Sequence, residues 1–210
     1  MVKIAVLVSG GGTNLQALID AEQKCAFKNG NLSLVISSKS DAFALERAKK
    51  ANIKTCVHLR KDYQDVEMYS QALLRTLKEN EIDFIVLAGF MTIFSETLTQ
   101  AYENKIINVH PALIPSFCGK GFYGLHVHEG ALKRGVKLTG ATVHFVNEEC
   151  DGGPIILQKA VEVHDDDTAE TLQKRVMQEA EWELLPKAVS LFCEGKISII
   201  NNRVVIKSPV

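Results

Sequence analysis

Apolar, β-branched runs alternate with amphipathic helical patterns through the first half of the chain, and this alternation restricts the fold more than any other feature. Strands are expected at 3–8, 32–37, 54–59 and 83–89, and helices at 14–24, 41–51 and 65–80. The first and last of these strands are apolar at successive positions, which is typical of strands covered on both faces of a parallel sheet. The pattern therefore predicts an α/β fold, a doubly wound and mostly parallel sheet with right-handed crossovers.

The second half of the chain is less regular. The stretch PALIPSFCGKGFYGLHVH, residues 111–128, contains two prolines and three glycines and predicts an ordered loop. Further strands are expected at 139–146 and 154–163, which would make the sheet mixed, and a long helix at 168–193 capped by Asp167 or Thr168. Asn-Asn between two β-rich runs predicts a hairpin in the tail. No linker or repeat is found, so we expect one domain over 1–210.

The composition excludes several classes of protein. The chain is 46% apolar and 23% charged with a formal net charge of -1, so it should fold and has no basic surface for nucleic acid or an anionic membrane. Five widely spaced cysteines without a C-x-x-C pair predict reduced thiols rather than disulfides or zinc. No run is long enough to span a membrane, and the expected compartment is the cytoplasm.

A glycine-rich loop, VSGGGTNLQALID, follows the first predicted strand and opens the first helix. At this point a doubly wound fold presents backbone amides and a positive helix end to an anion. Leu15 stands where the dinucleotide fingerprint needs glycine, and no Walker lysine follows, so NAD and ATP are disfavoured. The loop indicates a phosphate site, although glycines that only make a tight turn would leave the same pattern.

Asn108 and His110 lie two residues apart at the end of a predicted strand, so both side chains point to the same side, near the edge where ligands bind. Asp151 precedes Gly152 and Gly153 in a bend that could return a carboxylate to this edge. An amide donor, a charged imidazole and a carboxylate suit attack on a carbonyl: Asn108 and His110 can hold the developing oxyanion, and His110, charged beside Asp151, can move protons. A turn asparagine, a buried histidine and an Asp-Gly turn remain the alternative interpretation.

The remaining histidines and possible nucleophiles give weaker signals. His126 and His128 have no ligand partners in the sequence, so we expect loop or substrate contacts rather than a metal site. His144 alternates with apolar neighbours and is expected to face the site. No G-x-S-x-G elbow is present, and covalent catalysis by Ser116 or Cys118 is a minor hypothesis.

Five segments, VSGGGTNLQALID, VLAGFMTIFS, INVHPALIPSF, GATVHFV and DGGPIILQ, occur in an order that closely resembles the glycinamide ribonucleotide transformylases of purine synthesis. The similarity covers roughly residues 2–195. It implies transfer of the formyl group of 10-formyltetrahydrofolate to the primary amine of glycinamide ribonucleotide, with Asn108, His110 and Asp151 catalytic and no metal or covalent intermediate. The H-P-x-L-x-P element is shared with methionyl-tRNA formyltransferase and formyltetrahydrofolate hydrolase.

The resemblance also implies the binding residues. A half formed by 1–105 would bind the ribonucleotide phosphate, a half formed by 106–195 would carry catalysis and folate, and 196–210 would form the hairpin. The phosphate site corresponds to Gly12, Thr13 and Asn14, and the folate pocket to Phe90, Met91, Thr92, Ile93 and Phe94 with Val146, Asn147, Glu148 and Glu149. Thr92 stands where an arginine is common in relatives.

A ribose-binding glutamate is expected on the last helix. Counting back from Pro186 indicates Glu181, with Gln178 one turn earlier, whereas counting from Arg175 would put Ala180 there. A one-residue insertion between Arg175 and Pro186 accounts for this difference.

Two other hypotheses remain open. One is a hydrolase or a tRNA-directed relative, both of which carry additional domains that a chain of this length lacks. The other is a non-catalytic nucleotide- or folate-binding module on the same fold. The expected partners are therefore the two small substrates, without nucleic acid or membrane, and the expected assembly is a monomer or weak homodimer.

Overall fold

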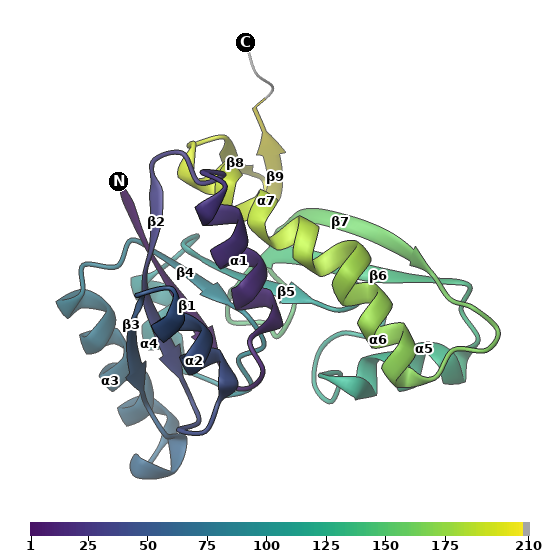
Figure 1. The fold of residues 1–210 in the computed structure, drawn as a ribbon, viewed down its shortest axis with the longest axis horizontal. Coiled ribbons are helices and arrows are strands. Elements are labelled where there is room, and N and C mark those ends of the chain that lie inside the picture. The colour runs from purple at the N-terminus through teal and green to yellow at the C-terminus, as the bar shows by residue number, and fades with distance from the viewer. Residues whose placement is uncertain (208–210) are drawn as a thin grey trace. The chain divides into compact units, whose positions relative to one another are not determined.

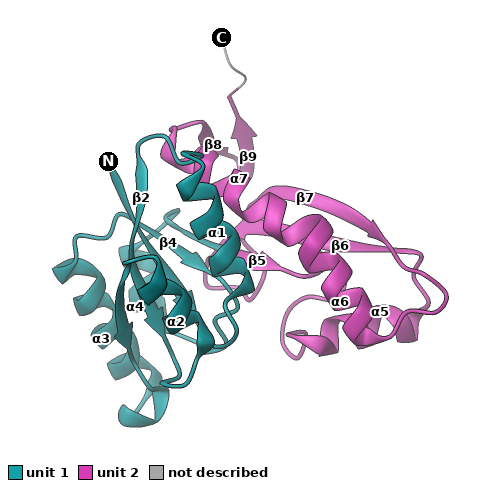
Figure 2. Ribbon diagram, viewed as in Figure 1, with its two compact units in different colours: residues 1–107 teal, residues 108–210 magenta. Residues whose placement is uncertain are grey.

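The computed structural model describes residues 1–207, and residues 208–210, the end of the predicted hairpin segment, lie outside the described residues. The chain divides into two compact units, Met1–Ile107 and Asn108–Val210 (Figure 2). Within the described residues, one seven-stranded sheet has the order β3-β2-β1-β4-β5-β6-β7, and β8 and β9 form a two-stranded sheet.

Unit 1 contains the predicted βαβ rhythm. Its strands are β1 (Val2–Val8), β2 (Gly30–Ser37), β3 (Lys54–Val57) and β4 (Phe84–Leu87). Its helices are α1 (Thr13–Gln23), α2 (Phe43–Lys50), a 3-10 turn (Arg60–Asp62), α3 (Val66–Glu79) and α4 (Glu96–Ala101). The sequence pattern did not indicate α4.

The strands of unit 1 pair in parallel, β1 with β2 and with β4, and β2 with β3. Because crossovers between parallel strands are right-handed, α1 and α2 cover one face of these strands and α3 and α4 the other (Figure 1). Residues 4–8 and 84–86 have no exposed surface, as expected of strands covered on both faces. The strand order changes direction between β1 and β4: β2 and β3 follow on one side of β1, whereas β4 lies on its other side. The loops after β1 and β4 therefore meet at the edge of the sheet where ligands usually bind.

Unit 2 begins at Asn108, within β5 (Ile106–His110). Its elements are α5 (Leu125–Arg134), β6 (Leu138–Phe145), β7 (Ile155–Glu162), α6 (Ala169–Val176), α7 (Trp182–Cys193), β8 (Ile197–Ile200) and β9 (Arg203–Ile206). Strands β6 and β7 are antiparallel, which confirms a mostly parallel sheet that becomes mixed toward the C-terminus.

Two features of unit 2 refine the predicted elements. The segment expected as a loop through residue 128 is helical from Leu125 onward, because α5 begins there. The predicted long helix is interrupted by a π-helical turn at Met177–Glu181. It begins at Ala169, and the N-cap is Thr168, whose hydroxyl accepts from the Thr171 amide in a capping box. Among the described residues, no helix is long and apolar enough to cross a membrane.

Candidate active site

The end of β5 brings a histidine beside a carboxylate. The Nδ1 atom of His110 lies 3.6 Å from Oδ2 of Asp151, and the His110 side chain is only 5% exposed. Asp151 occupies the bend after β6 in a left-handed conformation, with φ of 55°. The predicted pairing of His110 with Asp151 is therefore present in the geometry.

A second histidine, His144 on β6, connects Asn108 to the same carboxylate. Its Nε2 atom lies 3.5 Å from Asp151 Oδ1 and 3.3 Å from Asn108 Nδ2. Its Nδ1 atom lies 2.8 Å from the Phe145 carbonyl, and because a carbonyl only accepts, Nδ1 carries the proton. Nε2 therefore faces both the Asn108 amide and the Asp151 carboxylate, so His144 positions these two side chains.

The loop between β5 and α5 covers the polar edge of the cluster. The Phe117 carbonyl accepts a 2.8 Å hydrogen bond from His110 Nε2, and the Gly119 amide donates a 2.9 Å bond to Asp151 Oδ2. The His110 proton that could reach a substrate oxygen is thus held on Nε2, facing a main-chain carbonyl that an oxyanion would replace.

Burial and neighbouring charges set the protonation states of this cluster. Burial lowers the pKa of His110 below its ordinary value, against the opposing effect of Asp151, so the resting imidazole is neutral near pH 7. This differs from the expected charged form. Burial of Asp151 opposes its ionisation, but the bonds from His144 and the Gly119 amide outweigh burial and lower its pKa to about 2.

Thr142 on β6 holds the chain immediately after His110. Its hydroxyl donates to the Ala112 carbonyl at 2.7 Å and accepts from the Ile114 amide at 3.1 Å, while the Gln158 amide donates to the Ile114 carbonyl. These bonds join the segment after β5 to β6 and β7, and so fix the chain that follows His110.

Two thiols lie near the carboxylate, but neither is activated. Burial and the charge of Asp151 raise the pKa of both Cys118 and Cys150. Since the thiolate is the nucleophile, both groups are poor candidates for covalent catalysis.

In unit 1 the glycine loop joins β1 to α1 as predicted. Gly12 has a left-handed backbone with φ of 71° and stands directly before the first residue of α1, and Asn14 is buried in the first turn. The loop is linked to the segment after β4, because the Met91 amide donates a 2.9 Å bond to Ser9 Oγ.

The segments predicted for folate are partly apolar and exposed. Ile93 is 79% exposed and Met91 51%, and the rings of Phe90 and Phe94 are 6.3 Å apart. Residues 146–149 follow β6, where Asn147 Oδ1 accepts from the Glu149 amide at 3.1 Å. Each segment follows the end of a strand, but its ligand stays a prediction.

The candidate ribose glutamate lies in the π-helical turn. Glu181 is only 6% exposed, and Gln178 in the same turn is exposed. Because a π-helical turn contains one more residue than an α-helical turn, it accommodates the insertion inferred between Arg175 and Pro186.

Sequence reasoning left His144 and two main-chain groups out of the predicted catalytic set. The alternation of His144 with Val143 and Phe145 was the available signal, whereas no sequence pattern indicates the Phe117 carbonyl. His128 was expected to contact loop or substrate, but it is fully buried on α5. Within residues 1–207, no group of three or more histidine, cysteine, aspartate or glutamate residues is arranged to hold a metal ion.

Comparisons with known proteins agree on one family. The profile described as formyl transferase matches residues 2–189. Phosphoribosylglycinamide formyltransferase from Haemophilus influenzae is 40% identical over 202 residues, which is 96% of this chain and 92% of that protein.

Solved structures give the same result. Glycinamide ribonucleotide transformylase 1 from Symbiobacterium toebii has a TM-score of 0.93 and 39% identity, and the match covers 99% of this chain and 95% of the transformylase chain. A formyltetrahydrofolate deformylase from Pseudomonas syringae has a TM-score of 0.88 and 26% identity, and the match covers 99% of this chain but only 66% of the deformylase.

Proposed function

The chain belongs to the formyl transferase family, and on that premise we infer that it transfers the formyl group of 10-formyltetrahydrofolate to the primary amine of glycinamide ribonucleotide, in purine biosynthesis. The observation that carries the assignment of the reacting groups is the cluster of Asn108, His110 and Asp151 around His144. Near-complete coverage of the Haemophilus influenzae enzyme supports the choice of acceptor.

The reaction begins when the amine of the ribonucleotide adds to the formyl carbon and the carbonyl oxygen gains negative charge. Asn108 Nδ2 and His110 Nε2 are the donors for this oxygen, and the oxyanion takes the position of the Phe117 carbonyl at His110. Stabilisation of charge that develops only in the transition state lowers the barrier.

The tetrahedral intermediate then needs a proton transfer. The attacking nitrogen loses a proton, N10 of the folate gains one, and the bond between the formyl carbon and N10 breaks. His110 carries this proton on Nδ1, because Nε2 is already protonated, and the adjacent Asp151 carboxylate stabilises the imidazolium that results. Water can connect His110 to N10.

The binding residues complete the proposal. Gly12, Thr13 and Asn14 bind the phosphate of the ribonucleotide, and Glu181 with Gln178 binds the ribose. The folate lies against residues 90–94 and 146–149, and residues 90–94 supply no positive charge to the folate carboxylates. Exposed apolar side chains at Met91 and Ile93 support an apolar ligand here.

The first experiment follows tetrahydrofolate release spectrophotometrically from 10-formyltetrahydrofolate, with and without glycinamide ribonucleotide. Release that requires the ribonucleotide is the expected result. Release without it would identify a hydrolase, the second candidate that the likeness to the Pseudomonas syringae deformylase favours. No release by folded protein would leave only a binding function.

The role of His110 is tested by His110→Ala, with His164→Ala as the matched control at an exposed histidine. Loss of the oxyanion donor and proton carrier should lower kcat by at least about a hundredfold, while binding of a folate inhibitor changes little. Full turnover of His110→Ala would remove His110 from the mechanism.

We further propose one formyltransferase domain over 1–210, present as a monomer or weak homodimer in the cytoplasm. The uninterrupted family match and five free cysteines support the domain and the reducing compartment. Sedimentation velocity measures the assembly.

A further inference from the structure

Three successive carbonyl groups of the glycine loop are each held by a donor of unit 1. The Gly10 carbonyl accepts from the Ala44 amide at 3.1 Å, and the Gly12 carbonyl accepts from the Gln16 amide at 2.9 Å. The middle carbonyl, that of Gly11, is the one held by a charged side chain, because Arg47 Nε donates to it at 2.8 Å. The loop is therefore fastened to α2.

Fixing a carbonyl also fixes the next amide. A trans peptide group is planar, so the Gly12 N–H points away from the Gly11 carbonyl that Arg47 holds. Within residues 1–207 the amides of Gly11 and Gly12 donate to no main-chain carbonyl. Successive amides around a left-handed residue form a concave anion site, and Gly12 has this conformation.

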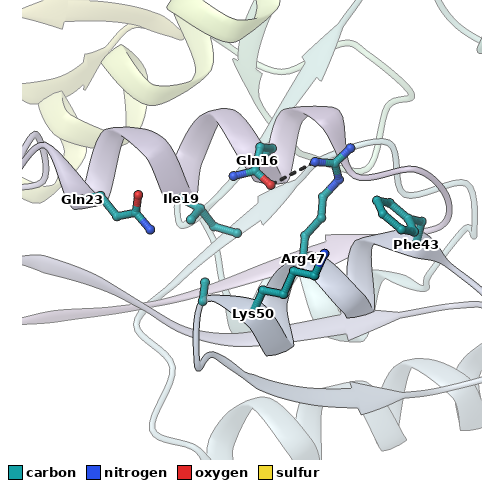
Figure 3. A pocket seen from close by; sticks show the side chains of 7 residues that line it. Gln16, Ile19, Gln23, Phe43, Arg47 and Lys50 are labelled. Carbon is teal, nitrogen blue, oxygen red and sulfur yellow. Dashed lines mark hydrogen bonds between the residues drawn. The ribbon is translucent and has the colours of Figure 1, made fainter.

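The guanidinium is itself rigidly held. Its Nη1 donates to Gln16 Oε1 at 2.9 Å, and its carbon atom lies 5.0 Å from the centre of the Phe43 ring. Figure 3 shows Arg47 reaching from α2 toward Gln16 on α1. Both residues line a cavity of about 200 Å³ between the two helices. Lys50 lines this cavity one turn further along α2. The planar fork of arginine suits two bonds in fixed directions, which a lysine ammonium cannot reproduce.

We propose that Arg47 is a positioning residue for the phosphate of the ribonucleotide, acting through the peptide group between Gly11 and Gly12. The cation orients this peptide and polarises it, so the Gly12 amide donates more strongly to the phosphate. Arg47 does not touch the phosphate. The inference rests on the proposed function only in naming the ribonucleotide, since the phosphate site itself can be tested without turnover.

The direct test measures binding of ribose 5-phosphate, with ribose as its counterpart without phosphate, by calorimetry. The variants are Arg47→Ala and Arg47→Lys, and Lys50→Ala is the control because it removes a cation from the same cavity without changing the loop. Arg47→Ala should weaken ribose 5-phosphate binding about tenfold, the usual effect of losing one charge-assisted hydrogen bond. Arg47→Lys should recover part of this loss, and Lys50→Ala should bind like the wild type.

Kinetics supply a readout that a purely structural role would not give. Arg47→Ala should raise KM for glycinamide ribonucleotide about tenfold, with kcat and KM for the folate within about twofold of the wild type. A general loosening of unit 1 would instead lower kcat and alter both KM values. If Arg47→Ala does not fold by circular dichroism, the same comparison is made with Arg47→Lys.

The outcomes separate the two proposals. If the wild type binds ribose 5-phosphate but does not transfer the formyl group to glycinamide ribonucleotide, the proposed function is overturned, and the Arg47 comparison can still be made. Equal binding of ribose 5-phosphate by wild type and Arg47→Ala, or by wild type and a folded Arg47→Lys if the alanine variant is lost, would overturn the role of Arg47. Wild-type binding of ribose 5-phosphate no tighter than ribose would overturn the phosphate site itself.

Discussion

Replacing Gly12 with alanine tests the close packing of the glycine loop on α2. An added Cβ at Gly12 would lie 2.6 Å from Ala44 Cβ and 2.8 Å from Ala44 Cα. Because the second contact is with a backbone atom and Ala44 is fully buried, relief requires a shift of α2 or of the loop. Gly12 also has φ of 71°, a conformation that alanine adopts at a cost.

The two effects add. The left-handed backbone costs about 1 kcal/mol for a residue with a Cβ, and overpacking of a buried contact costs about 1 to 3 kcal/mol. We therefore expect Gly12→Ala to lower the free energy of unfolding by about 2 to 4 kcal/mol. Gly10→Ala is the matched control, because Gly10 is exposed and an added Cβ would meet no atom within 4 Å. Its effect should stay within about 0.5 kcal/mol.

Urea unfolding followed by circular dichroism measures both variants against the wild type, with a check that the dependence on urea concentration is unchanged. Gly12→Ala should unfold at a clearly lower urea concentration than Gly10→Ala. Equal stability of the two variants would refute the argument that contact with Ala44 requires glycine at this position.

Two further predictions concern acid. His128 has no hydrogen-bond partner on either ring nitrogen among the described residues, and burial lowers its pKa to about 4. The unfolded chain takes up this proton near the usual pKa of 6.5, so stability falls as pH drops from about 6.5 toward 4, and His128→Leu should remove about 2 kcal/mol of the loss between about pH 7.5 and 5. Urea unfolding at both pH values tests this, with exposed His164→Gln as control, and an unchanged pH dependence in His128→Leu would contradict it. Asp151 has its pKa lowered to about 2 from 3.8, so its contribution is complete above about pH 4 and is lost as pH falls through 2. Wild type should therefore lose about 1 kcal/mol more than Asp151→Asn between about pH 5 and 3, and parallel losses in the two proteins would disprove this contribution.

The catalytic candidates could be predicted because their signals are local. Asn108 and His110 share a side of β5 because side chains two apart on a strand point the same way. Asp151 was recognisable from the glycines that follow it. The roles of His144 and of the Phe117 carbonyl could not be predicted, since each depends on which residue of a distant segment lies opposite the end of β5.

The protonation of His110 shows the same limit. Its sequence neighbours indicate a charged imidazole beside a carboxylate, but the degree of burial decides its pKa, and burial is a property of the packed structure. Arg47 gives no sequence signal at all. Its bond to the Gly11 carbonyl depends on α2 packing against the loop 36 residues earlier in the chain.

By itself the sequence determined the alternation of strands and helices, the parallel sheet and the positions of the glycine loop and of the Asn108, His110 and Asp151 motif. These follow from periodicity and from turn residues, which act over a few positions. Only the tertiary structure decided the start of α5, the π-helical turn before α7 and the contacts that orient Asn108 and the glycine loop. The physical reason is that packing, burial and strand register join residues far apart in the chain, and no local pattern specifies them.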